Sequence, residues 1–246
     1  MIVKEIQDWE IQMIHEKSLE ILEEVGVNFE HEEILEFFRK SGVKTEGCRV
    51  FFTPQQVEAQ LENLQESFVI ETPFASLKIG GGSRAVATAS GAMTILKEGK
   101  IVTPSVEDYI DLKKMDDMSP FVNLGCVPGI YAAGLPEGET ELVKTALSLR
   151  YSKKPLIASC ETGRSAAQSI RFIKEFYGDT GAYYTLGIEN IISPLRYCRE
   201  DVAATLAYVR QNQPVCITCC SAPGMSSPIT VGGTVVQNNA EILAGI

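Results

Sequence analysis

Apolar positions in the first third of the chain recur mainly at helical spacing. An apolar stripe predicts an amphipathic helix over residues 8–25, ended by Gly26 as its C-cap. A second helix is predicted over residues 31–41. Thr53-Pro54-Gln55-Gln56 has the residue types of a capping box with proline at the first helical position, so a third helix is expected from there to about Gln65.

Two short apolar runs after these helices resemble antiparallel strands, at residues 68–72 and 76–79. Gly80-Gly81-Gly82 follows them, but it lacks the Lys-Ser/Thr of a phosphate-binding loop and indicates a plain turn. We therefore expect residues 1–83 to form an N-terminal helical region with short strands. Nothing in this region indicates catalysis.

From Arg84 onward the pattern changes to a regular alternation of strands and helices. Short apolar runs begin near residues 86, 121, 155, 183 and 214, at intervals of 28 to 35 residues. Helical patterns lie between or after them, at residues 105–115, 139–150, 163–177, 200–211 and 235–243. This alternation predicts a parallel sheet covered by helices.

Five such units fit either an open doubly wound sheet or part of a (β/α)8 barrel. A nucleotide-binding open sheet usually carries a glycine fingerprint after its first strand, whereas this chain has Ser90-Gly91-Ala92-Met93. The intervals also match the ~31 residues per unit of a barrel of ~250 residues. We therefore predict an incomplete (β/α)8 TIM barrel over residues 84–246. Three units would be missing, so we expect a truncated chain or a piece of a longer protein.

Composition limits the classes of partner. The formal net charge of −10 argues against charge-driven binding to nucleic acid or to an anionic membrane. No apolar run reaches the ~18 residues of a membrane span, and the N-terminus lacks a signal-peptide pattern, so we expect a cytoplasmic protein. An unfinished barrel would expose the edge of its fifth strand, which predicts self-association as a homo-oligomer.

The chain has seven cysteines and two histidines. The odd number of cysteines, most of them within apolar runs, favours reduced thiols over a disulfide framework. Both histidines, His15 and His31, fall in the N-terminal helical region. A histidine-based triad or a histidine-rich metal site is therefore not expected.

Polar residues at the predicted strand ends are the candidates for chemistry, because the carboxyl ends of parallel strands share one rim. Two carboxylates stand there, Glu161 after the third strand and Glu189 after the fourth. They could hold a cationic substrate, bind a metal, or act as acid and base. Alternatively, each caps a helix or pairs with Arg164 or Arg196.

The adjacent thiols Cys219 and Cys220 allow a different reading. With Cys126 or Cys160 as a third ligand, they could form a zinc site that activates a thiol acceptor. Packing of cysteines as small apolar residues in a barrel interior would explain the same pattern.

Three stretches resemble the trimethylamine methyltransferase family. Ser227-Pro228-Ile229-Thr230-Val231-Gly232-Gly233 and the following residues 237–245 resemble the family signature Ala-Pro-Val-Thr-Leu-Ala-Gly…Gln-x-Asn-Ala-Glu-x-Leu-Ala-Gly. Residues 14–27 resemble its opening helix. Glu189-Asn190-Ile191-Ile192-Ser193-Pro194-Leu195 resembles its stretch that ends in Ser-Pro-Leu.

The resemblance implies a (β/α)8 barrel that moves a methyl group from a tertiary or quaternary amine to the Co(I) of a partner corrinoid protein. Trimethylamine or a betaine such as glycine betaine would be the donor, and the chain itself would bind neither a metal nor a cofactor. A permanent cation is bound by carboxylates and by the faces of aromatic rings. The expected substrate-binding residues are Glu161, Glu189, Ser193, Cys220, Pro223 and Tyr131. The zinc-thiolate enzyme and a non-catalytic fragment are the alternatives.

Overall fold

A computed structural model describes residues 6–246, which divide into two compact units. The first unit joins three segments: the chain up to Leu64, Glu189–Ala203, and Ile217–Ile246. The second unit comprises Gln65–Ile188 and Ala204–Cys216. These units follow other boundaries than the division expected after residue 83, which stays a prediction about domains.

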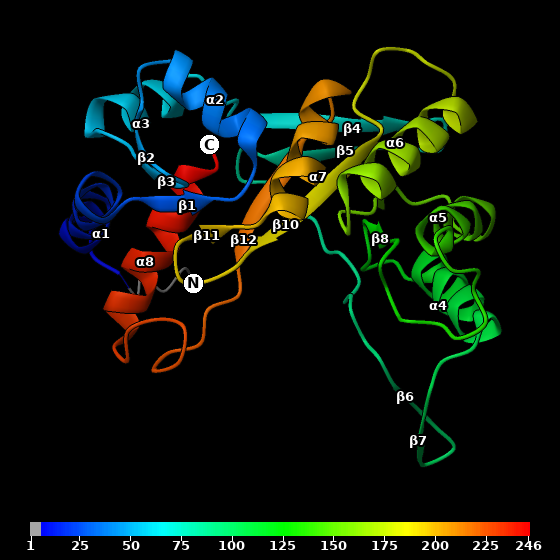
Figure 1. Ribbon diagram of the computed structural model, residues 1–246. Helices are drawn as coiled ribbons and strands as arrows, with labels where there is room; N and C mark the ends of the chain where they lie inside the picture. The colour runs from blue at the N-terminus through cyan, green and yellow to red at the C-terminus, as the bar shows by residue number, and fades with distance from the viewer. Residues whose placement is uncertain (1–5) are drawn as a thin grey trace. The chain divides into compact units, whose positions relative to one another are not determined.

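The first unit is a small sheet with helices (Figure 1). Its elements are α1 (Asp8–Glu20), a π turn (Ile21–Val25), β1 (Val27–Phe29), α2 (Glu32–Lys40), β2 (Lys44–Glu46), β3 (Arg49–Phe51), α3 (Pro54–Leu61), β11 (Arg196–Tyr197) and α8 (Val231–Ala244). Gly26 ends the π turn that continues α1, with φ of 72° in the left-handed region that favours glycine, so the helical stretch stops where the sequence predicted. Helix α3 ends four residues before the predicted Gln65.

The sheet of the first unit joins residues that are far apart in the sequence. Its strand order is β11-β1-β3-β2, with β1 parallel to β11 and antiparallel to β3. The Phe29 ring stacks on Tyr197 with centroids 4.7 Å apart. Next to them, the Arg196 guanidinium donates to both carboxylate oxygens of Glu30, at 2.8 and 3.0 Å. The N-terminal strand therefore depends on the segment near residue 196 for its pairing.

The predicted capping box of α3 is confirmed. Thr53 Oγ1 accepts from the backbone N–H of Gln56 at 3.3 Å, and the Gln56 side chain accepts from the backbone N–H of Thr53 at 3.0 Å. We expect Thr53→Ala to lower the free energy of unfolding by about 1 kcal/mol, because a first-turn N–H loses its acceptor. Urea denaturation measures this change. Thr53→Ser keeps the hydroxyl and should behave like the wild type; equal losses in both variants would contradict the capping role.

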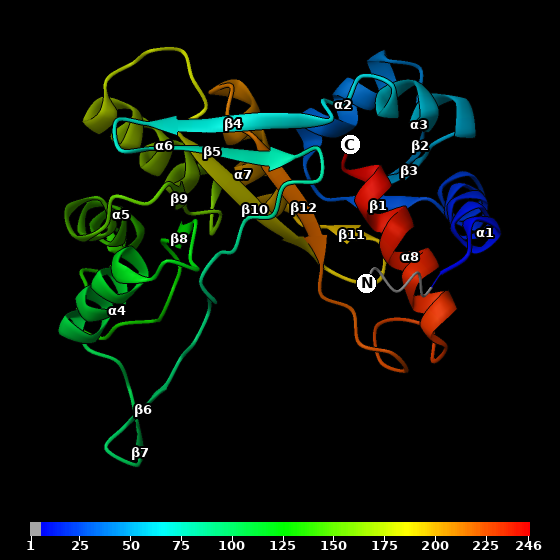
Figure 2. The ribbon, with the colours of Figure 1, turned by 180° about the vertical axis from the view of Figure 1, so that it is seen from behind.

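The second unit contains most of the strand–helix alternation. Its elements are β4 (Ser67–Thr72), β5 (Ala75–Gly80), β6 (Ile95–Lys97), β7 (Lys100–Val102), α4 (Val106–Met118), β8 (Gly125–Cys126), α5 (Thr140–Tyr151), β9 (Leu156–Ile157) and α6 (Gly163–Tyr177). Three further elements contain residues of both units: β10 (Thr185–Ile191), α7 (Arg199–Arg210) and β12 (Val215–Cys219). Figure 2 shows the same elements from behind.

The predicted parallel sheet is confirmed for its central strands. The order is β12-β10-β9-β8, and β9 is parallel to both neighbours, with Leu156 aligned to Gly125 on one side and Thr185 on the other. A parallel bridge between Ala87 and Leu124 places the first predicted strand beside β8. The strands therefore lie in sequence order, and consecutive helices α4, α5 and α6 pack side by side.

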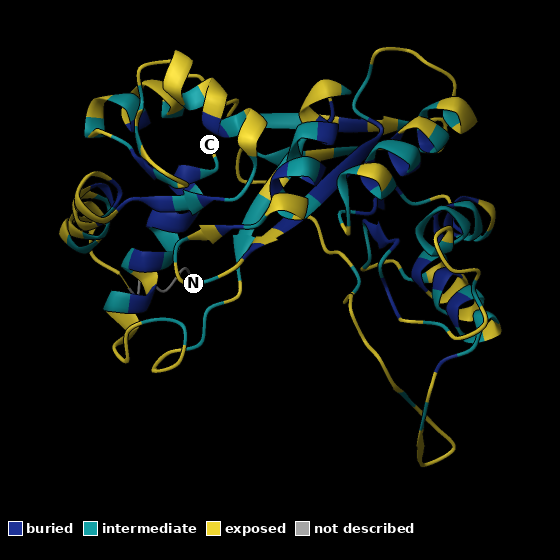
Figure 3. Cartoon of the chain, in the orientation of Figure 1, coloured by how far each residue is buried: buried dark blue, intermediate teal, exposed yellow. Residues whose placement is uncertain are grey.

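The core of the second unit lies between these strands and their helices, and Figure 3 shows its buried residues in dark blue. It includes Val127, Leu149, Leu156, Ala166, Ile170, Ile173 and Tyr208. A second cluster joins Leu124, Cys126, Ile157 and Leu186 to Ile70 of the β4–β5 hairpin. No helix within residues 6–246 has the length and apolarity needed to cross a membrane.

Candidate functional site

Two predicted site residues meet at the carboxyl ends of neighbouring strands in the second unit. Tyr131 follows β8, Glu161 follows β9, and the Tyr131 hydroxyl donates to Glu161 Oε1 at 3.5 Å. Both side chains reach solvent, with Tyr131 44% exposed. The negative charge of Glu161 is the main cause that raises the pKa of Tyr131, so its hydroxyl stays protonated at neutral pH.

A lysine and a second carboxylate from α5 complete this group. Lys144 is fully buried, and its Nζ donates to Glu141 Oε1 at 2.9 Å. The same ammonium lies 5.4 Å from the centroid of the Tyr131 ring, within the range of a cation–π contact. We call Tyr131, Glu141, Lys144 and Glu161 the Tyr131 cluster. It combines an aromatic face with two carboxylates, the groups that attract organic cations.

A second buried lysine supports the segment that leads to Tyr131. Lys113 Nζ donates to the backbone carbonyl of Cys126 at 2.6 Å and to Asp116 Oδ2 at 3.2 Å, and both side chains are buried. Burial lowers the pKa of Lys113, and Asp116 opposes this effect. Gly129 has φ of 35°, and a Cβ there would lie 3.2 Å from the Cys126 carbonyl oxygen and 3.4 Å from Lys113 Nζ. The loop after β8 is thus packed directly against this ammonium.

Glu189 and Ser193 stand in the first unit. Glu189 is 4% exposed, and its backbone carbonyl accepts from the Thr218 hydroxyl at 3.2 Å. The Ser193 hydroxyl donates to Glu241 Oε2 at 2.7 Å, and the backbone N–H of Leu195 donates to Glu241 Oε1 at 2.8 Å. Glu241 of α8 is fully buried, so it anchors the loop that carries Ser193.

Cys220 and Pro223 lie exposed in the loop after β12. Helix α8 holds this loop as well: Asn238 Oδ1 accepts from the Ser221 hydroxyl at 2.6 Å, and the Gln237 amide donates to the Ser226 carbonyl at 2.9 Å. Gln237 and Glu241 occupy fixed positions of the signature recognised in the sequence, and Asn238 lies at its variable position between Gln237 and Asn239. Their spacing serves a structural purpose, because one helix fixes the two loops that bear Ser193, Cys220 and Pro223.

The cysteines are all free thiols, as predicted. Within residues 6–246, no three or more His, Cys, Asp and Glu side chains converge as they would to hold a metal ion. Burial, with Glu241 and Cys220 nearby, raises the pKa of Cys219, which disfavours the thiolate that a zinc ligand requires. The geometry of the described residues therefore gives the zinc-thiolate alternative no support.

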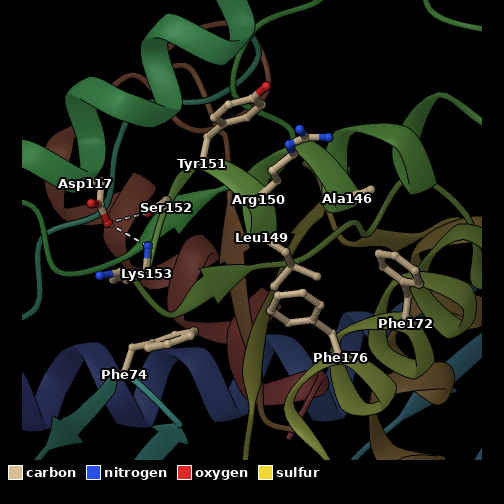
Figure 4. A pocket seen from close by; sticks show the side chains of 10 residues that line it. All are labelled: Phe74, Asp117, Ala146, Leu149, Arg150, Tyr151, Ser152, Lys153, Phe172 and Phe176. Carbon is tan, nitrogen blue, oxygen red and sulfur yellow. Dashed lines mark hydrogen bonds between the residues drawn. The ribbon is translucent and has the colours of Figure 1, made fainter.

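A pocket of about 540 Å³ in the second unit lies elsewhere (Figure 4). Phe74, Phe172 and Phe176 line it with the last turn of α5, and Asp117 accepts there from the backbone N–H of Lys153 at 2.6 Å. These residues of α5 precede β9, so the pocket is at the amino end of that strand. None of the predicted site residues lines it.

Sequence reasoning missed the charged residues behind the candidate site. Lys113, Lys144 and Glu241 sit on helices, where a charged side chain is ordinarily solvated. A signal was available for Lys113: it stands four residues after Tyr109 and three before Asp116, on one helix face. That face is buried, and the Tyr109 hydroxyl donates to the Val127 carbonyl at 2.8 Å.

Comparison with known protein families identifies the family of this chain. Residues 2–246 match the family described as "Trimethylamine methyltransferase (MTTB)". The chain belongs to this family. The match extends over the signature on α8 and the strand–helix units alike, and it confirms the resemblance found in the sequence.

Members of the MTTB family with assigned activities resemble the chain at moderate identity. Glycine betaine methyltransferase of Desulfitobacterium hafniense is 30% identical over 96% of this chain, and proline betaine:corrinoid methyltransferase of Eubacterium limosum is 31% identical over 99%. Trimethylamine methyltransferase MttB of Methanosarcina barkeri is 24% identical over 96%. The chain spans about half the length of these relatives, 51%, 53% and 51% respectively.

A solved structure shows the same fold. The crystal structure of Methanosarcina barkeri monomethylamine methyltransferase (MtmB) superposes with a TM-score of 0.65 at 12% identity, over 95% of this chain and 50% of that chain. The chain thus has the mixed α/β fold of that methyltransferase.

Proposed function

We propose that this chain takes part in moving a methyl group from a quaternary or tertiary amine to the cobalt of a corrinoid carried by a partner protein. The observation that carries the proposal is the Tyr131 cluster at the carboxyl ends of β8 and β9. An aromatic ring and a carboxylate 3.5 Å from its hydroxyl are groups that attract a cation, and the charge of Lys144 beside the ring is balanced by Glu141.

The names of the relatives support both the reaction and the substrate class. Two relatives are named as methyltransferases of proline betaine and of L-carnitine with a corrinoid. The betaine and carnitine enzymes are 26–31% identical to this chain, whereas the trimethylamine enzymes are 24–25% identical. We therefore propose a betaine as the methyl donor in preference to trimethylamine.

The proposed reaction requires the protein to position the substrate and involves little proton transfer. A quaternary ammonium has no proton to lose, so the protein must hold its methyl carbon in line with the acceptor and keep water away. When the partner is bound, its corrinoid supplies the nucleophilic cobalt. Tyr131 would meet the ammonium with its ring, and Glu161 would balance the positive charge.

Four residues of the first unit stay proposed as substrate-binding residues on the strength of the sequence. Glu189 would add a second carboxylate, and Ser193, Cys220 and Pro223 would shape the loops held by α8. As a frame for the chain, we propose that the strands from Ala87 to Cys219 form an arc of a (β/α)8 barrel. The parallel order of the strands and the likeness to MtmB support that frame.

Ligand binding tests this proposal without requiring turnover. Isothermal titration calorimetry with glycine betaine, proline betaine, carnitine and trimethylamine should show binding of at least one betaine. We expect Tyr131→Leu to weaken that binding by about 3- to 30-fold, the range of a cation–π contact of ~0.5–2 kcal/mol. Glu161→Gln, which removes only the charge, should also weaken it.

Glu137→Gln provides the matched control, because Glu137 is an exposed carboxylate in the loop between Tyr131 and α5. It should bind as the wild type does. If none of the four amines binds, or if Tyr131→Leu and Glu161→Gln bind like the wild type, the Tyr131 cluster is not the substrate site.

A further inference from the structure

A β-hairpin that the sequence analysis missed stands between the first predicted strand and α4. Strands β6 and β7 pair in antiparallel register, with Leu96 opposite Ile101 and Lys97 opposite Lys100. Glu98 and Gly99 form the two-residue turn, and both have positive φ, 51° and 75°. Such a turn matches the twist of the strands and fixes the hairpin register. The hairpin is therefore a defined structure with a defined set of faces.

One face of this hairpin presents apolar side chains to solvent. Leu96 is 74% exposed and Ile101 is 77% exposed, and as directly opposed residues they project from the same face. Met93, just before β6, is 72% exposed. Figures 1 and 2 show the hairpin projecting from the rest of the second unit, so no neighbouring element of that unit covers the pair. A rigid, paired apolar tip of this kind is typical of a surface that binds another protein.

The base of the hairpin is attached to the segment that carries the candidate site. The Tyr131 backbone N–H donates to the Ala92 carbonyl at 2.9 Å, and the Ala92 N–H donates to the Gly129 carbonyl at 3.3 Å. On the other side, the Ala133 N–H donates to the Pro104 carbonyl at 2.8 Å. Both ends of the hairpin segment are thus hydrogen-bonded to the residues immediately around Tyr131.

An ion pair adds a further attachment. Lys97 Nζ donates to Asp108 Oδ1 at 2.7 Å, and Asp108 also accepts from the backbone N–H of Ser105 at 2.9 Å as part of the capping box of α4. The Lys97 ammonium and the Ser105 donors lower the pKa of Asp108 to about 2, so the carboxylate stays charged across the physiological range. The hairpin is therefore held to the start of α4 as well as to the Tyr131 segment.

We propose that the Leu96–Ile101 face is a docking surface for the corrinoid partner protein. This inference rests on the proposed function. Methyl transfer requires the cobalt to come within bonding distance of a methyl group held at the Tyr131 cluster, so the partner must cover the surface next to that cluster. The hairpin is the described element that shares backbone hydrogen bonds with Tyr131 and leaves an apolar pair uncovered.

The chemistry of the tip indicates what the partner offers. The side chains of Leu96 and Ile101 carry no hydrogen-bonding groups, so the partner would meet them with an apolar surface. Binding through such a pair gains from burial of apolar area and depends little on salt. Lys97, paired with Asp108, and Lys100 lie on the opposite face of the hairpin and would stay outside this interface.

The test measures binding of cobalamin-loaded corrinoid proteins from the betaine systems of Desulfitobacterium hafniense and Eubacterium limosum to the full chain, by biolayer interferometry. We expect the double variant Leu96→Asp with Ile101→Asp to bind at least tenfold more weakly than the wild type. The double variant Leu96→Thr with Ile101→Thr removes the apolar pair but keeps residues that favour strands, so the hairpin should still form. It should also weaken binding, which would show that the apolar side chains matter and not only the hairpin fold. Met118→Asp is the matched control, because Met118 is 83% exposed at the far end of α4.

The outcomes separate this inference from the proposed function. Weaker binding in both double variants, with glycine betaine affinity and Met118→Asp unchanged, supports the docking surface. If the wild type binds a corrinoid protein and the double variants bind it equally well, the docking surface is wrong and the proposed function stands. If neither corrinoid protein binds the wild type, the proposed function fails and the inference fails with it.

Discussion

Replacing Lys113 by alanine is expected to lower the free energy of unfolding by about 3–5 kcal/mol. The substitution leaves the Asp116 carboxylate, 3% exposed, without its cationic partner, and it removes the donor from the Cys126 carbonyl. It also opens a cavity where the lysine side chain was fully buried. Urea denaturation followed by circular dichroism measures the change.

The neighbouring residue provides the control for this prediction. Lys114 is half exposed and pairs with exposed Asp111 at 3.0 Å, so Lys114→Ala should change the free energy of unfolding by less than about 1 kcal/mol. Lys113→Met fills the space without the charge and should recover part of the stability, with Asp116 still unpaired. Equal effects of alanine at positions 113 and 114 would show that the buried pair contributes nothing.

Replacing Glu241 by alanine is the second change with a large expected effect, also about 3–5 kcal/mol. The carboxylate is fully buried and accepts from the Ser193 hydroxyl, the Leu195 backbone N–H and the Gln237 amide, at 2.7, 2.8 and 2.9 Å. All three donors would lose their acceptor in a place that water does not reach. We also expect faster hydrogen exchange in the loop at residues 192–196, measured by mass spectrometry.

Graded substitutions test the same site. Ser193→Ala removes one donor and should cost about 1 kcal/mol. Glu241→Gln keeps one acceptor oxygen but replaces the other with an amide NH2 group, which would face groups that are themselves donors. The loss in free energy of unfolding should therefore fall between those of Ser193→Ala and Glu241→Ala. Protection of residues 192–196 that is unchanged in Glu241→Ala would show that α8 does not hold this loop.

The long elements could be predicted from the sequence because their signals are local. Helix α6 has the predicted bounds 163–177, with Thr162 as a capping residue before it and Gly178 after it. The short strands were harder. Strands β8 and β9 contain two residues each, and only the regular interval between apolar runs revealed them. The β11-β1-β3-β2 sheet was missed because two- and three-residue strands show no periodicity and one of them lies about 170 positions away.

Only the exposed residues of the candidate site could be predicted from the sequence. Tyr131 and Glu161 were expected at one rim because the strand ends of a parallel sheet share it, and their side chains do meet, while their role in substrate binding stays a prediction. The residues behind them were not, since nothing local distinguishes buried Lys144 from an exposed lysine. The hairpin had a usable signal, Glu98-Gly99 between Leu96 and Ile101, which is a two-residue turn between apolar residues.

The pairing of β1 with β11 has a consequence for synthesis of the protein on the ribosome. Residues 65–188, the larger segment of the second unit, emerge as one uninterrupted stretch, whereas the N-terminal helices and strands must wait for residues near 196 and for α8. During that interval the α1 helix lacks its contacts with α8, and the ring of Phe29 lacks the Tyr197 ring on which it stacks. The nascent chain therefore carries an early segment whose burial is delayed until α8 has been made, and we expect it to need protection from aggregation until translation has passed Ala244.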